Sequence, residues 1–357
     1  MKLGIVGLPQ SGKTTIFNAL TRGTQPTGTV TGKIEVHEAV LDVPDDRVDK
    51  LAEMFKPKKT IYAKVTYDDI SGLDGSAKSG ISGELLNKLA QMDGFIHVVR
   101  CFENENVVHP NGSVDPLRDI ASMESDFVLN DMISVERRLE RLHDEKKKGG
   151  GRDKAVIDRE IALFDRMHEC LGDEKPLRSL GLTDEEKRSL SGFGMLSLKP
   201  ILILLNLDET QDAPAVPDQG AETMVSSIRG KIEMEIAQLP EDDAAMFMEE
   251  YGITELALKQ VIRLSYDLLD QQSFFTAGAD ECRAWTTSRH ATAPEAAGVI
   301  HTDLQKGFIR AEVVAYDDLM ELGSMNEAKA KGKLRLEGKE YLVKDGDILN
   351  IRFNVSK

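Results

Sequence analysis

The segment GLPQSGKT at residues 7–14 has the residue types and the spacing that bind the phosphates of a nucleotide. It matches G-x-x-x-x-G-K-[ST] and lies between an apolar, strand-like run and a helical pattern, which is the context that this motif requires. In such loops backbone N–H groups surround the β-phosphate, a lysine contacts the β- and γ-phosphates, and a hydroxyl binds Mg²⁺. We therefore predict a triphosphate hydrolase in which Lys13 acts in catalysis and Thr14 is a ligand of the Mg²⁺ cofactor. The predicted nucleotide-binding residues of this loop are Pro9, Gln10, Ser11, Gly12, Lys13, Thr14 and Thr15.

A second segment, Asp69-Ile-Ser-Gly72, fits D-x-x-G at the end of a strand-like run. In nucleotide hydrolases the aspartate of this motif orients the Mg²⁺ shell, and the glycine amide meets the γ-phosphate. We predict Asp69 as a metal-site residue and Gly72 as part of the catalytic site. By itself D-x-x-G is usually a turn, and its position one strand after the phosphate loop supports the functional interpretation.

A third segment, Asn206-Leu207-Asp208-Glu209, ends the apolar run 201–207, where GTPases carry N-K-x-D to recognise guanine. Leu207 replaces the lysine, and Glu209, one methylene longer, replaces the aspartate that would hold the N1 and N2 donors of guanine. We therefore predict that guanine preference is lost and that the Asn206 side chain and nearby backbone contact adenine. Asn206, Leu207 and Glu209 complete the predicted nucleotide-binding set. The alternative is a plain turn at the end of a strand.

Short apolar runs separated by helical patterns predict the elements that hold these motifs. The runs at 3–8, 64–70, 94–102, 201–207 and 223–228 are typical of buried strands in a parallel sheet. Helical patterns at 14–21 and 83–91 lie between them. Strand–helix alternation of this kind predicts a doubly wound α/β domain.

The pattern changes between residues 126 and 193. Two helical stripes, joined by the glycines 149–151, predict an inserted antiparallel hairpin. The first stripe is Val128, Met132, Val135, Leu139 and Leu142, and the second is Ile157, Ile161, Phe164, His168 and Leu171. From residue 274 onward, short alternating segments around helices predict a small α+β domain, with KDGD at 344–347 as a tight turn between two strands. The predicted domains are a P-loop nucleotide-binding domain (1–125 and 194–273), a helical-hairpin or coiled-coil insertion (126–193) and a C-terminal domain (274–357).

The charge balance limits the partners. The formal net charge is −16 and aromatic residues make up 5%, which disfavours general nucleic-acid binding and a base-stacking surface. Residues 137–154 nonetheless hold eight basic against four acidic residues, and residues 329–344 hold six against two. Such runs are usually solvated faces, but in so acidic a chain they favour local contacts with RNA phosphates. We expect no reading of DNA sequence. No run approaches the roughly 18 apolar residues of a membrane span, so we expect a cytoplasmic protein with no membrane partner.

Segments along nearly the whole chain are similar to one family. Together they resemble YchF, the Obg-like ATPase family; they are GLPQSGKTTIFNAL, DISGL, HVVRCFENENVVH, NLDE, FFTAGADECRAWT, APEAAGVIHTDLQKGFIRAE and VKDGDILNIRFNV. The resemblance implies that the insertion is the family's helical hairpin and that the C-terminus is a TGS domain, a ubiquitin-like β-grasp module. It also implies an ATPase with weaker or variable GTP use that associates with ribosomes. The large subunit would be met through the hairpin tip and the TGS domain.

Several departures from the family pattern bear on hydrolysis. Lys33 stands where the family has the threonine that senses Mg²⁺, so we expect the first switch to stay open, unless Thr29 or Thr31 replaces that ligand. As in the family, a hydrophobic residue, Leu73, follows D-x-x-G where Ras-like GTPases position water with glutamine. The family's candidate replacement matches His109, which we predict to be catalytic; the alternative is a solvated side chain.

These observations predict a Mg²⁺-dependent, slow ATPase switch that binds ribosomes. Three alternatives remain: an ATP-gated ribosome-binding scaffold with little hydrolysis, a GTPase translation factor, and a metabolic P-loop kinase. The substitutions at residues 207 and 209 argue against the second, and no phosphoryl-acceptor pocket is evident for the third.

Overall fold

A computed structural model of the chain describes residues 1–26, 36–73, 81, 83–149 and 151–354. The chain divides into two compact units. The first, here called the P-loop unit, comprises residues 2–39 and 66–264, and the second, the C-terminal unit, comprises residue 1, residues 40–65 and residues 265–357. Residues 40–65, predicted as part of the nucleotide-binding domain, lie in the C-terminal unit. The limits expected at residues 126, 194 and 274 stay predictions.

The P-loop unit is built on a six-stranded sheet with the order β2-β4-β1-β5-β6-β7. Its strands are β1 (Lys2–Val6), β2 (Val36–Asp42), β4 (Lys64–Ile70), β5 (Gly94–Arg100), β6 (Ile201–Asn206) and β7 (Thr223–Ile228). The pairs β1–β4, β1–β5, β5–β6 and β6–β7 are parallel. β5 and β6 are buried along their whole length, as expected for strands with helices on both faces. This confirms the doubly wound α/β fold.

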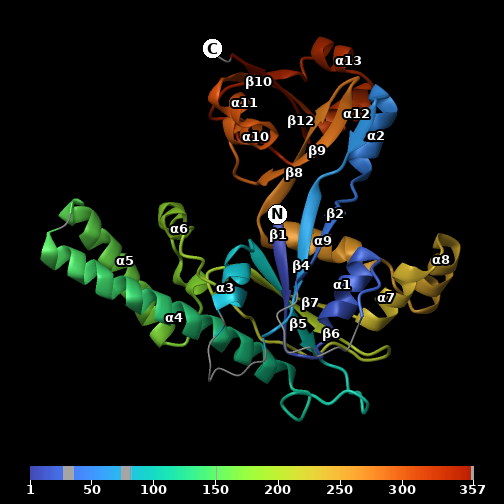
Figure 1. Cartoon of the computed structure of the whole chain (residues 1–357). Coiled ribbons are helices and arrows are strands. Elements are labelled where there is room, and N and C mark those ends of the chain that lie inside the picture. Colours follow the sequence, from blue (N-terminus) through green and yellow to red (C-terminus); the bar gives the residue numbers. More distant parts are fainter. Residues whose placement is uncertain (27–35, 74–80, 82, 150, 355–357) are drawn as a thin grey trace. The chain divides into compact units, whose positions relative to one another are not determined.

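Helices cover the two faces of this sheet (Figure 1). On one face, α1 (Lys13–Thr21) packs against α7 (Gly230–Gln238). On the other, α3 (Gly83–Ala90) and the first turns of α4 (Pro116–Lys148) share an apolar core with the strands. α8 (Glu241–Glu250) and α9 (Ala257–Leu268) follow α7.

The helical hairpin consists of α4 and α5 (Lys154–Gly172), which pack side by side. α4 begins where Asp115 accepts a hydrogen bond from the Arg118 amide and Pro116 occupies the first turn, and it ends at Gly149 in the left-handed region (φ 69). A 3₁₀ turn (Leu177–Leu180) and α6 (Asp184–Leu190) complete the insertion.

Both predicted stripes enter the hairpin core, with one exception. His168 is exposed and lies 3.6 Å from Glu136, whereas Met167 and Leu163 are buried. The predicted second stripe was wrong at this position, because His168 lies at the solvent-exposed edge of the α4–α5 contact, beside Glu136 of α4, and Met167 fills the core instead.

The C-terminal unit holds a second six-stranded sheet, β11-β10-β12-β8-β9-β3. The strands are β3 (Lys59–Ile61), β8 (Gln271–Ala277), β9 (Glu281–Ser288), β10 (Phe308–Ala315), β11 (Arg335–Glu337) and β12 (Asp347–Phe353). The helices are α2 (Asp46–Phe55), α10 (Ala293–Ile300), α11 (Thr302–Lys306), α12 (Tyr316–Leu322) and α13 (Met325–Ala330). Helix α10 packs on one sheet face, in the β-grasp manner predicted from the family. The segment 40–65 contributes α2, which contacts β8 and β9, and the edge strand β3, which pairs in parallel with β9.

The turn at 344–347 differs from the prediction. The Asp347 amide donates to the Lys344 carbonyl (3.1 Å) and β12 follows. Between β11 and the turn, residues 338–343 form only an isolated bridge, from Leu342 to Thr292, rather than a strand. In the part of the chain that the structure describes, no helix is long and apolar enough to cross a membrane.

Candidate nucleotide site

The phosphate loop runs from the end of β1 to the start of α1 and is shaped by backbone conformations that side chains resist. Gly7 and Gly12 have φ values of 150 and 95, and Gln10 has φ 63. A Cβ atom on Gly12 would lie 2.3 Å from Nδ2 of Asn206. The glycine is therefore required both by its φ and by the close approach of β6. The Ser11 side chain is buried, whereas Pro9 and Thr15 are half-buried.

Lys13 lies in the first turn of α1 and points back over the loop. Its Nζ donates to the carbonyls of Gly7 and Leu8, both at 2.9 Å. Burial lowers the pKa of Lys13 to about 8, with the negative charge of Asp69 opposing that shift. The ammonium is thus held at the place where a phosphate would compete for it.

The two predicted metal-site residues meet directly. Thr14 Oγ1 donates to Asp69 Oδ2 at 2.8 Å, which joins α1 to the end of β4. Asp69 Oδ1 is buried and has no hydrogen-bond partner among the described residues. Burial raises the pKa of Asp69, and the Thr14 hydroxyl opposes this rise. Mg²⁺ prefers hard oxygen ligands and is commonly held by one or two carboxylates together with phosphates. A hydroxyl, a carboxylate and an unpartnered carboxylate oxygen fit that ion.

Asn206 ties the loop to the neighbouring strand ends. Its Nδ2 donates to the Ser11 carbonyl (3.0 Å), and its Oδ1 accepts from the Gly230 amide (3.1 Å). The side chain is 3% exposed. Both ends of this amide fix the phosphate loop against β6 and α7, and its predicted contact with adenine stays a prediction.

Leu207 and Glu209 lie in different surroundings. Leu207 is buried in a cluster that includes Val99, Cys101 and Ile120, and its place in the nucleotide-binding set stays a prediction. Glu209 is exposed, and its Oε1 lies 2.9 Å from Nζ of Lys231. Only Glu209 of the two faces solvent beside the strand end.

The D-x-x-G segment is described as far as Leu73. Gly72 has φ 105 and is exposed, so its conformation favours glycine. Leu73 is buried in the core that α3 and α4 share with the sheet. Its side chain packs rather than facing a water. Lys33, Thr29 and Thr31 lie outside the described residues, as does the segment 74–80.

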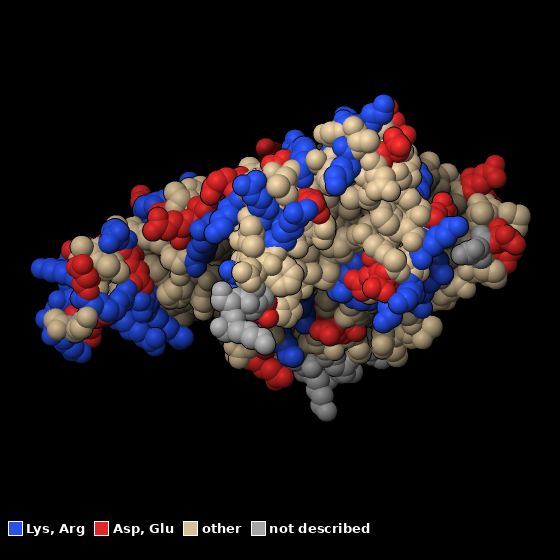
Figure 2. All heavy atoms as spheres, turned by 90° about the horizontal axis from the view of Figure 1, so that it is seen from above, with Lys and Arg blue, Asp and Glu red and all other residues tan. Residues whose placement is uncertain are grey.

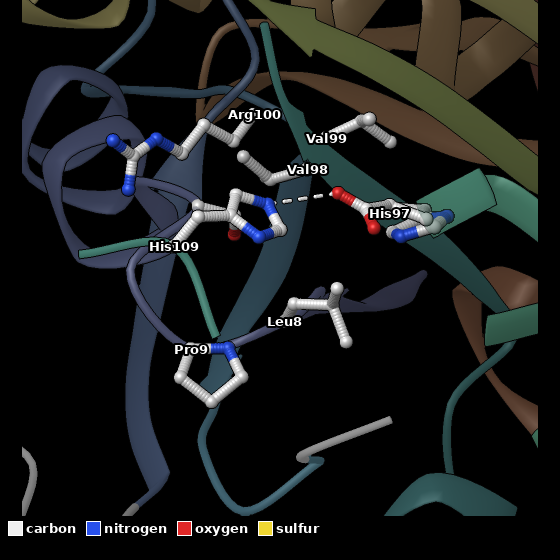
Figure 3. Close-up of a pocket in the computed structure, with 9 residues that line it drawn as sticks. Leu8, Pro9, His97, Val98, Val99, Arg100 and His109 are labelled. Atoms are coloured by element: carbon white, nitrogen blue, oxygen red, sulfur yellow. Dashed lines mark ion pairs between the residues drawn. The ribbon is translucent and has the colours of Figure 1, made fainter. Parts of the chain in front are cut away.

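His109 follows β5 on the loop that leads to α4, and it is buried, which excludes the solvated alternative. Figure 3 shows its ring beside Pro9 and Leu8 of the phosphate loop. The Asn111 amide donates to Nδ1 (3.1 Å), so Nε2 carries the ring proton and faces Asp119 Oδ2 at 2.9 Å. His97 lines the same pocket, and burial together with Lys13 lowers its pKa to about 3, which keeps it neutral.

Sequence reasoning missed two side chains around His109. Asp119 is 2% exposed in the first turns of α4, and only the Asp115-Pro116 helix start hinted at its location. Arg100, at the end of β5, donates through Nε to the Phe102 carbonyl and through Nη2 to the Val107 carbonyl, which fixes the loop that carries His109. Neither residue belongs to a motif with a regular spacing.

The fold and the site together define a P-loop nucleotide-binding protein. A sheet with parallel strands carries a glycine loop that leads into a helix, and beside this loop lie Lys13, Thr14 and Asp69. Comparison with known proteins identifies the family to which this chain is similar. Residues 271–354 match the family model YchF-GTPase_C, described as "Protein of unknown function (DUF933)". The chain is 40% identical over 365 residues to the ribosome-binding ATPase YchF of Bacillus subtilis, covering 99% of each. It is 35% identical over 370 residues to Obg-like ATPase 1 of Oryza sativa, covering 100% of this chain and 93% of the relative.

A solved structure agrees with these relatives. The YchF GTPase of Schizosaccharomyces pombe matches with a TM-score of 0.81 at 30% identity, over 99% of this chain and 97% of that one. The chain therefore belongs to the YchF family of Obg-like ATPases, which confirms the resemblance inferred from its motifs and the predicted fold class.

Proposed function

We propose that this chain is a Mg²⁺-dependent, slow ATPase switch that associates with ribosomes in the cytoplasm. The observation that carries the proposal is the convergence of Lys13, Thr14 and Asp69 at the mouth of the phosphate loop. The relatives named as ribosome-binding ATPases support the substrate and the partner. The relative named a GTPase leaves the choice of base to experiment.

In this proposal each residue has a defined part. Lys13 releases the carbonyls of Gly7 and Leu8 to contact the β- and γ-phosphates. Thr14 and Asp69 hold the Mg²⁺, which neutralises charge on the phosphates. The Gly72 amide faces the γ-phosphate. His109 would have to leave its buried contact with Asp119 before it could act on a water.

Slow turnover follows from the packing of Leu73. Its side chain is buried and apolar, so it cannot orient a water as the glutamine of Ras-like GTPases does. This observation also favours the alternative of an ATP-gated ribosome-binding scaffold with little hydrolysis. Phosphate release measured with and without ribosomes separates the two, because only the switch should release phosphate faster when ribosomes are present.

The choice of base is tested by titrating ATP and GTP at matched Mg²⁺. ATP should bind about tenfold to a hundredfold more tightly, because the charge-assisted guanine contacts are absent. Glu209→Asp should narrow the difference, whereas Asp212→Glu, at another exposed carboxylate of the same loop, should leave it unchanged. Equal or tighter binding of GTP by the unmodified chain would refute the ATPase assignment.

The hairpin end is the proposed contact with ribosomal RNA, together with the TGS domain, and the large subunit is the expected partner. Figure 2 shows Lys and Arg side chains gathered at the end of the projecting hairpin. Some are already paired there: Lys146 with Asp158 (2.7 Å) and Arg152 with Glu160 (2.7 Å). The Lys146–Asp158 pair is exposed on both sides, and exposed pairs are worth little, so an RNA phosphate can replace Asp158. Arg137, Arg141, Lys147 and Lys154 are exposed and have no ion pair among the described residues.

A further inference from the structure

The contact between His109 and Asp119 connects a residue that lies beside the phosphate loop to the long helix α4. His109 packs beside Leu8 and Pro9; its Nδ1 accepts from the Asn111 amide, and its Nε2 lies 2.9 Å from Asp119 Oδ2 on α4. Asp119 is buried as well. The pair is therefore not a surface ion pair that water can loosen.

The other carboxylate oxygen of Asp119 accepts hydrogen bonds that hold the loop carrying His109. Asp119 Oδ1 accepts from Nε and Nη2 of Arg118 (3.0 and 2.9 Å) and from Nδ2 of Asn111 (3.2 Å). Arg118 also donates to the Ser113 carbonyl at 2.7 Å. Residues 109–113 are thus fastened to the first turn of α4 through one carboxylate.

α4 belongs to two apolar cores. Met123 and Phe127 pack in the core of the sheet, which also contains Val6 before the phosphate loop and Leu73 after D-x-x-G. Further along, Val135 and Leu142 pack with α5 in the core of the hairpin. At 1.5 Å per residue, the 33 residues of α4 span about 50 Å and end at the lysines 146–148. One unbroken helix therefore runs from Asp119 to the basic tip.

We propose that Asp119 is a positioning residue that couples the nucleotide state to the hairpin tip, a proposal that rests on the function proposed above. While the His109 ring lies against Asp119, the first turn of α4 is held beside the phosphate loop. When His109 turns toward a bound triphosphate, the buried carboxylate loses the ring nitrogen that lies beside its Oδ2, and α4 moves to bring that oxygen to another partner. The tip moves with the helix. By linkage, docking of the tip shifts His109 in return.

The test compares the affinity of the full-length chain for purified ribosomes in ADP and in a non-hydrolysable ATP analogue. In the unmodified chain the two affinities should differ by about 5- to 150-fold, the usual range of coupling between sites. Asp119→Asn removes the charge at constant size and should reduce that ratio to about twofold or less, leaving the mean affinity unchanged. Glu105→Gln is the matched control, since Glu105 is an exposed carboxylate on the loop that carries His109. It should keep the full ratio.

The outcomes are distinct. An unmodified chain that does not bind ribosomes in either nucleotide refutes the proposed function. Binding that is equal in both nucleotides, or an Asp119→Asn variant that keeps the full ratio, overturns the coupling. So does a variant that weakens binding equally in both states, because that marks a merely structural role.

A spectroscopic measurement and a second variant cover the case in which Asp119→Asn folds poorly. In the ligand-free chain labelled with ¹⁵N-histidine, His109 should show the Nε2–H tautomer that the Asn111 amide fixes, with Nε2 facing Asp119, and another tautomer overturns the contact. His109→Gln removes the other partner of the pair and should abolish the same ratio. If it keeps the ratio, the pair does not carry the coupling.

Discussion

Replacing Asn206 by aspartate changes one atom at the junction of the phosphate loop and β6. Oδ1 can still accept from the Gly230 amide, but Nδ2, which donates to the Ser11 carbonyl at 3.0 Å, becomes an oxygen. The site is 3% exposed, so water cannot screen the two oxygens. Losing the hydrogen bond and leaving a buried carboxylate against a carbonyl should cost about 3 kcal/mol of unfolding free energy at pH 8.

The cost should depend on pH in a defined direction. When the introduced carboxyl is protonated it can donate to the Ser11 carbonyl again, so folding raises its pKa from about 4 to about 6, at 1.36 kcal/mol per unit. The folded state then binds more protons than the unfolded state in this window, and stability is lost as pH rises through it. Below about pH 4 the penalty should nearly disappear.

The assay is urea unfolding followed by far-UV circular dichroism at pH 4, 5 and 8, together with ATP affinity at pH 8. Glu209→Gln is the matched control because Glu209 is an exposed residue three positions along, and its stability should change by less than about 0.5 kcal/mol. The reasoning is refuted if Asn206→Asp is as stable as the unmodified chain at pH 8. It is also refuted if the loss is the same at all three pH values.

The remaining predictions concern single groups. Lys13→Ala should abolish hydrolysis without unfolding the chain, and persistent turnover would place catalysis elsewhere. Because the pKa of Lys13 in the ligand-free chain is about 8, ATP affinity should fall by up to about tenfold per pH unit above that value, and Lys13→Arg, which does not titrate there, should remove this slope. Burial raises the pKa of Asp131 to about 6, so the contribution of Asp131 to the free energy of unfolding should fall by about 3 kcal/mol as pH rises from about 4 to 7. The urea midpoints of the unmodified chain and of Asp131→Asn should therefore differ by an amount that changes with pH, and a constant difference would contradict this. Changing lysines 146–148 to glutamine should weaken ribosome binding and flatten its salt dependence, whereas the same change at the exposed lysines 56, 58 and 59 should not. If this variant sediments with ribosomes as the unmodified chain does at every salt concentration, the lysines at the tip form only a solvated face.

The sequence predicted strands that are completely buried, but not strands that lie at a sheet edge or pair with a distant part of the chain. The predicted runs 94–102 and 201–207 contain β5 and β6, because continuous apolar runs mark strands covered on both faces. β2 was missed because its exposure alternates at a sheet edge, and β3 because three residues paired with a distant strand leave no periodic signal.

In the site, too, the sequence predicted the residues of local motifs but not the contacts that depend on tertiary packing. Lys13, Thr14 and Asp69 meet as their motifs predicted, because those motifs encode backbone geometry. The contact of His109 with Asp119 depends on how α4 is rotated against β5, and no spacing in the sequence determines that rotation. For the same reason the sequence does not predict that Leu207 packs with Val99 and Ile120 in a buried cluster.

The joining of residues 40–65 to residues 265–357 also has a consequence for synthesis. Lys58 and Asp280, which form an ion pair at 2.8 Å, are 222 residues apart. At 5–20 residues per second, α2 and β3 leave the ribosome about 10–40 s before the strand β9 that completes their sheet. During that interval Val48 and Leu51, both buried in the finished unit, have no partner strand to cover them. The C-terminal unit cannot fold as a unit until the last part of the chain has been made, so truncation before β9 should leave α2 exposed and prone to aggregation even where the P-loop sheet is complete.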